Sequence, residues 1–231
     1  MNNQIKKINL KHSLIFFLFC NIFSLVTFVI NDFAISPLIC LLLILSIGIS
    51  HGSLDNIKGK KLFQIFGINN LSIFYLLYIL TSITIIILWI IAPMFSLLIF
   101  LFIASYHFGK EDTQFLIIKK SFFTQLLYFI KGTLIILAPM YFHFDETVSI
   151  FKLLLVDNES FYKFLNFIET NRILYFGIVL ATLSNIFLFT KNFEFKKFTI
   201  FLDYFSILII NYIFSPLIAF TLYFCFLHSI R

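Results

Sequence analysis

The chain has 231 residues, of which 61% are apolar and only 12% are charged, and its mean hydropathy is +1.01. Water-soluble domains carry about 25% charged residues, so the composition excludes a soluble globule and indicates a membrane protein. The net charge of +6 does not predict nucleic-acid binding, because the basic residues form short clusters between apolar runs. Cys20, Cys40 and Cys225 lie in apolar runs without CxxC spacing, which favours core packing over disulfides or a thiolate metal site.

Apolar runs of helical length recur along the whole chain. They cover residues 14–30, 33–50, 71–91, 92–108, 122–138, 173–190 and 198–214, and a further run begins at Pro216. Each run is expected to be a helix, because a lipid-exposed backbone must satisfy its own hydrogen bonds. We therefore predict an all-α polytopic transmembrane helical bundle of about eight spans, in which residues 1–231 form a single integral membrane domain.

The basic residues are unevenly divided between the two sides of this bundle. With eight alternating spans, thirteen of the seventeen Lys and Arg residues lie on the side of the N-terminus. Cytoplasmic loops carry such an excess, so we expect a multi-pass protein of the cell inner (plasma) membrane with a cytoplasmic N-terminus. The long loop over residues 139–172 is then on the outer side. Its segment 147–167 is loosely amphipathic and is expected to lie along the membrane surface.

The histidines are the most informative polar residues. His51 follows the second apolar run, His107 ends the fourth and His228 lies in the eighth. At about 1.5 Å of rise per residue, these three lie in the cytoplasmic half of the membrane, whereas His143 lies at the outer surface. Three imidazoles at one depth in hydrocarbon predict a shared metal ion, although imidazole suits several metals. His12 lies in the basic N-terminal stretch and is expected at the solvated surface.

Acidic residues near the same depth are candidates to orient the histidines. Asp55 and Asp112 follow two of the histidines within five residues, and a carboxylate that accepts the second ring N–H of a ligand fixes its tautomer. Asp203 lies inside the seventh run and Lys131 near the middle of the fifth. Each would be costly alone in hydrocarbon, so we predict that these two residues form an ion pair.

The same contexts resemble the Brp/Blh family of membrane β-carotene 15,15′-dioxygenases. The resemblance rests on His-Gly-Ser-Leu-Asp at 51–55, His-Phe-Gly with a following Asp at 107–112, Lys-Gly followed by Pro and Phe-His at 131–143, and Pro-Leu-Ile-Ala-Phe, Tyr-Phe and His-Ser-Ile-Arg at 216–231. In the family another ligand His follows the last motif directly, whereas this sequence ends at Arg231. We therefore expect that its C-terminal end is missing. Ser50 stands where the family usually has Pro.

The resemblance implies a specific chemistry. It implies a carotenoid-cleaving dioxygenase in which His51, His107 and His228 hold Fe(2+). The substrates would be β-carotene, which partitions into membrane lipid, and O₂. Cleavage of the central double bond would give two molecules of all-trans-retinal, which would pass to a microbial rhodopsin. Tyr106 and Tyr223 are candidates to line the substrate path.

Other classes of membrane protein remain as alternatives. A non-catalytic transporter would need polar groups across the full membrane depth, whereas three of the histidines cluster in one half. A lipid desaturase would carry HxxxH or HxxHH boxes, which this sequence lacks. An inactive relative stays open because the family's last ligand is not in the sequence. Metal content of the purified protein separates these classes.

Overall fold

The computed structural model describes residues 3–30, 35–52, 55–67, 70–117, 121–154 and 158–231, except for the side chains at 50–52, 55, 58 and 71. Within these ranges the chain is helical and contains no strand, which confirms the all-α prediction. The helices are α1 (Asn3–Val29), α2 (Pro37–Gly52), α3 (Asp55–Ile65), α4 (Leu71–Ile91), α5 (Pro93–Glu111), α6 (Phe122–Gly132), α7 (Leu134–Phe142), α8 (Phe144–Leu154), α9 (Glu159–Thr170), α10 (Ile173–Thr190), η1 (Phe195–Lys197), α11 (Phe198–Ile213), α12 (Pro216–Leu222) and η2 (Tyr223–His228).

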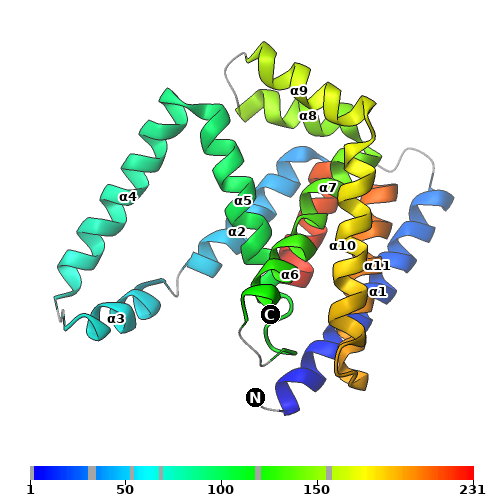
Figure 1. The fold of residues 1–231 in the computed structure, drawn as a ribbon, viewed down its shortest axis with the longest axis horizontal. Coiled ribbons are helices and arrows are strands. Elements are labelled where there is room, and N and C mark those ends of the chain that lie inside the picture. Colours follow the sequence, from blue (N-terminus) through cyan, green and yellow to red (C-terminus); the bar gives the residue numbers. More distant parts are fainter. Residues whose placement is uncertain (1–2, 31–34, 53–54, 68–69, 118–120, 155–157) are drawn as a thin grey trace.

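The helices form a bundle with two ends. Helix α1 packs along α11, α10 packs against α6 and α7, and α5 packs against α6. The α8 and α9 helices cover one end of the bundle, and the C-terminus lies toward the other end (Figure 1). Helices α3 and α4 extend to the side, where α4 contacts α5 (Figure 1).

Five helices among the described residues are long and apolar enough to cross a membrane: Asn3–Val29, Ser72–Ile91, Pro93–Glu111, Phe122–Phe142 and Ile173–Thr190. Shorter apolar helices, Pro37–Ile49 and Pro216–His228, occupy two more of the predicted runs. Helix α11 fills the remaining run with 16 residues. The positions of the runs are therefore helical, and the number of spans stays a prediction.

Two predicted breaks contain helices. Helix α7 continues through Pro139 to Phe142, although the sequence predicted an end before this proline. A proline removes one helical hydrogen bond, and the packing of α7 against α10 and α11 offsets that loss. The segment after Phe142 forms α8 and α9 rather than one amphipathic stretch. Likewise, α3 lies between the predicted apolar runs 33–50 and 71–91, where no helix was expected.

The main core holds the C-terminal helices in place. It joins α1, α7, α10, α11, α12 and η2 through the buried side chains of Phe16, Cys20, Leu134, Ala138, Ala181, Ile207, Ile210, Phe214, Ala219, Leu222, Tyr223 and Leu227. All three cysteines are buried and unpaired, as predicted. Packing of α12 against α2, α7 and α11, and of η2 against α1 and α2, positions the polar residues of the last turn.

A candidate metal centre

The first element of the site is the end of α5. Pro93 occupies the first turn of this helix, where a missing N–H costs nothing, and the helix runs to Glu111. Its last turns carry His107, and the N–H of Asp112 donates to the carbonyl of Phe108 at 3.1 Å. The backbone of α5 therefore fixes the position of Asp112 relative to His107.

The second element is the π-helical turn η2. The chain enters α12 through Ser215 and Pro216, and after Leu222 the hydrogen-bond pattern widens over Tyr223–His228. The Ser229 N–H donates to the carbonyl of Phe224, five residues earlier, at 3.0 Å. Isolated π-turns within helices are rare and are found mostly at functional sites.

The two elements bring two predicted histidines together. The rings of His107 and His228 have centroids 5.2 Å apart and are inclined by 70°. Asp112 Oδ1 lies 3.0 Å from His228 Nδ1, and the Tyr223 hydroxyl donates to Asp112 Oδ2 at 2.7 Å. His228, Asp112 and Tyr223 are each at most 3% exposed. His107 and His228, which are far apart in the sequence, thus lie side by side, with His228 bonded to a buried carboxylate and the His107 side chain exposed.

A buried ion pair stabilises the C-terminal residue beside this carboxylate. The Arg231 guanidinium donates to both oxygens of Asp203, at 2.7 and 2.8 Å, and to the hydroxyl of Ser13. It also lies over the ring of Phe115 and 3.8 Å from Asp112 Oδ1. The pair joins α1, α11 and the end of η2 around the Asp112 carboxylate.

This geometry corrects the predicted pairing of Asp203 with Lys131. Among the described residues, the ion-pair partner of Asp203 within 4.0 Å is Arg231, and Lys131 forms no such pair. Lys131 is buried and lines a cavity of about 10 Å³ together with Asp112 and Asn185. Such a cavity is at the lower limit for one water molecule. The rotation of α6 about its own axis, which the sequence does not reveal, directs Lys131 to this cavity.

The other predicted residues lie in different places. The His51 side chain and Asp55 fall outside the described side chains, although α2, which contains His51, packs against η2. His143 follows α7, 3.8 Å from Glu146, at the end of the bundle that α8 covers (Figure 1). His12 was predicted at the solvated surface, but it is half-buried and bonds the Phe226 carbonyl at 2.9 Å. The N-terminal segment is helical and packs on η2, which explains this difference.

The tyrosines proposed for the substrate path make specific polar contacts. Tyr106 donates to Gln125 Oε1 at 2.6 Å on the α6 side of α5, whereas Tyr223 contacts Asp112. The role of Tyr223, Arg231 and Ser13 around the carboxylate was not predicted. A signal for Arg231 was available in the sequence, because Asp203 inside an apolar run needs a basic partner and Arg231 lies at the end of another such run.

The described residues fit part of a metal site. No three described His, Cys, Asp or Glu side chains form a metal-binding group. A metal lies about 2.1 Å from an imidazole nitrogen, so two rings that share it have centroids about 4.5 to 5.5 Å apart. The 5.2 Å between His107 and His228 falls in this range. A carboxylate on the second ring nitrogen, as Asp112 provides for His228, is typical of histidine ligands.

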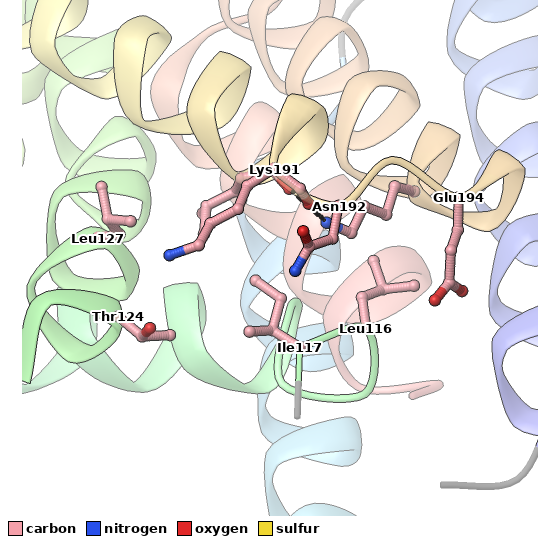
Figure 2. Close-up of a pocket in the computed structure, with 9 residues that line it drawn as sticks. Leu116, Ile117, Thr124, Leu127, Lys191, Asn192 and Glu194 are labelled. Carbon is pink, nitrogen blue, oxygen red and sulfur yellow. Dashed lines mark hydrogen bonds between the residues drawn. The ribbon is translucent and has the colours of Figure 1, made fainter. Parts of the chain in front are cut away.

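Two cavities differ in their relation to this centre. Figure 2 shows a cavity of about 190 Å³ between α6, the end of α10 and the segment after α5, where Asn192 points toward Ile117. Its described lining contains Lys191 and Lys197 but no histidine. A cavity of about 150 Å³ does include His228 and Arg231 in its lining. The centre therefore borders the second cavity and not the first.

Fold and site together define an all-α helical bundle with membrane-length apolar helices and a buried His–Asp centre. A family model described as "Beta-carotene 15,15'-dioxygenase" matches residues 42–231, which include all three predicted histidine ligands. The chain belongs to this family of carotenoid dioxygenases. Searches of curated proteins and of solved structures returned no significant match.

Proposed function

We propose that this chain cleaves β-carotene at its central double bond with O₂, at an iron ion held by His51, His107 and His228. The observation that carries the proposal is the pairing of His107 with an Asp112-bound His228 in a member of the dioxygenase family. The C15=C15′ bond breaks and each carbon takes one oxygen atom, so one O₂ balances two molecules of all-trans-retinal. Bound Fe(2+) would supply the activation of O₂ that this reaction requires.

The protein side chains have several tasks in this proposal. The ring plane of His228 is fixed by the protein itself, since Asp112 bonds its Nδ1 and Phe108 packs edge-on against the ring with centroids 4.8 Å apart. The neutral histidine set adds no negative charge to the metal. The apolar faces of the surrounding helices exclude water and receive an apolar polyene directly from the bilayer, without a desolvation cost. Positioning the middle of the polyene at the metal would select the central bond.

The membrane setting belongs to the same proposal. The excess of Lys and Arg on the side of the N-terminus supports an inner (plasma) membrane location with a cytoplasmic N-terminus. The resemblance of the motifs also supports transfer of the retinal product to a microbial rhodopsin.

Expression in cells that accumulate β-carotene tests the function. The gene is expressed with added iron, and pigments are extracted. We expect retinal with loss of the orange colour. Unchanged β-carotene in cells that contain the protein would contradict the proposal and favour a transporter or an inactive relative.

A further inference from the structure

The π-turn places two side chains on one carboxylate that an α-helix would direct to different sides. Tyr223 and His228 are five residues apart, and in an α-helix such residues point about 140° apart. In a turn with bonds between residues five apart, they lie one above the other. Both therefore reach Asp112, at 2.7 Å from the hydroxyl and 3.0 Å from Nδ1.

The Asp112 carboxylate is held from several directions at once. Its backbone is fixed by the last turn of α5, Tyr223 occupies Oδ2, and His228 and the guanidinium of Arg231 approach Oδ1. At 2% exposure the carboxylate has little contact with solvent. A buried acceptor without a hydrogen-bond partner is costly. Loss of the Tyr223 hydroxyl would therefore favour a rotation of the Asp112 carboxylate that brings Oδ2 to another donor. The donor within reach on the same turn is His228.

We propose that Tyr223 is a positioning residue for His228, acting through Asp112. By occupying Oδ2, the hydroxyl keeps Oδ1 directed at Nδ1, so that the proton of His228 stays on Nδ1 and Nε2 is the nitrogen that faces the metal. The ring of His228 is thereby set beside His107 before any metal binds. This inference rests on the proposed function for the identity of the metal, whereas the contacts among Tyr223, Asp112 and His228 are made by the protein's own side chains.

The test compares Tyr223→Phe with Tyr204→Phe. Tyr204 is a matched control, because its side chain lines the same small cavity as Asp112. Its hydroxyl bonds Thr182 at 2.7 Å, whereas the hydroxyl of Tyr223 bonds Asp112. Each full-length protein is purified in detergent without metal and labelled with ¹³C and ¹⁵N in its histidines. The signals of His228 are assigned by their loss in His228→Ala, and NMR then reports which ring nitrogen carries the proton.

We expect the Nδ1–H tautomer of His228 in the wild type and in Tyr204→Phe, and a mixture of tautomers in Tyr223→Phe. Titration with Fe²⁺ alone against a chromogenic chelator, without oxygen, should show about 10-fold to 100-fold weaker binding in Tyr223→Phe and no change in Tyr204→Phe. Equal tautomers and equal Fe²⁺ affinity in the two variants would overturn the inference. If Tyr223→Phe does not fold, Tyr223→Met replaces it, because this side chain also lacks the hydroxyl, and it must show the same mixture of tautomers.

These readouts separate the inference from the proposed function. The NMR measurement needs neither β-carotene nor metal. If Tyr223→Phe changes the tautomer of His228 but the wild type makes no retinal, the proposed function is overturned and the positioning role stands. If the wild type makes retinal but Tyr223→Phe leaves the tautomer unchanged, the positioning role is overturned and the proposed function stands.

Discussion

Asp203 and Arg231 form a buried ion pair through both carboxylate oxygens, with both side chains at most 5% exposed. Removing one partner of a buried ion pair leaves an uncompensated charge, which costs about 3 to 5 kcal/mol. We expect such a loss from Asp203→Asn and from Arg231→Met in detergent-induced unfolding. The double variant should lose clearly less than the sum of the two, because neither charge is then left alone.

Lys163→Ala is the matched control for this cycle. Its ion pair with Glu159 is exposed, so its loss should change the free energy of unfolding by no more than about 0.5 kcal/mol. Additive losses for Asp203 and Arg231 would show that the two side chains do not interact in the folded protein.

The histidines make a second prediction at the residue scale. His107→Ala and His228→Ala should each abolish cleavage and lower bound iron at least about 10-fold, because each removes a proposed ligand. His143→Ala should retain iron near the wild-type level, since His143 lies beside Glu146 at the opposite end of the bundle. Iron content of the purified proteins by mass spectrometry measures both effects. Loss of iron in His143→Ala would refute the assignment by depth.

Helices α5 and α6 cross at two glycines, and this contact decides how the end of α5 is placed. A Cβ atom on Gly109 would lie 1.9 Å from the Tyr128 carbonyl oxygen, and one on Gly132 would lie 1.7 Å from that of Ser105. Neither helix backbone can move aside without separating the pair. Gly109→Ala and Gly132→Ala should each destabilise the protein by about 3 kcal/mol, at the upper end for overpacking.

Gly48→Ala serves as the control for this contact. No atom lies within 4 Å of a Cβ at this position in α2, so alanine should be neutral or stabilise by up to about 1 kcal/mol through its helix propensity. Thermal unfolding in detergent compares the three variants. Equal melting temperatures would show that α5 and α6 do not approach closely.

The start of α1 is connected to the turn before α11 by an ion pair. Lys6 Nζ lies 2.9 Å from Glu194 Oε2, and this hydrogen bond and the charge of Lys6 lower the pKa of the Glu194 carboxyl. A carboxyl with a lowered pKa contributes stability above its ordinary value of about 4.3, and the contribution is lost as the pH falls through the lowered pKa. The difference in melting temperature between wild type and Glu194→Gln should therefore be largest near neutral pH and shrink in acid. A difference that is constant with pH would contradict the pairing.

At the scale of the whole molecule, the proposed orientation places the ends of the bundle on opposite sides of the membrane. The loop after α10 carries Lys191, Lys196 and Lys197, which favours the cytoplasm. The segment before α9 should be on the outer side. A fluorescent protein inserted at Asn192 should therefore fold and emit, and alkaline phosphatase inserted at Asn158 should be active. The reverse pattern would invert the topology.

Much of the architecture follows from the sequence, because apolar runs in lipid can satisfy their backbone only as helices. The positions of the runs, the burial of the cysteines and the shared depth of His107 and His228 were predictable from hydropathy and helix rise. The continuation of α7 through Pro139 was not predictable from the sequence, because it depends on packing against α10 and α11.

The partners of the buried polar groups were decided only by the tertiary structure. Lys131 and Arg231 are both basic and both lie near Asp203 in depth, but the rotation of each helix about its axis directs only Arg231 to that carboxylate. Likewise, the apolar pattern of residues 216–228 does not distinguish an α-helix from a π-turn. The π-turn at the end of this segment packs against α1, α2 and α12, and these contacts favour it over an α-helix. From the sequence alone, hydropathy predicted correctly that Lys131 and Asp203 are buried within apolar runs, but it placed the half-buried His12 at the solvated surface. Which of the buried polar residues touch depends on helix rotation and crossing, and these are set by contacts between residues far apart in the chain.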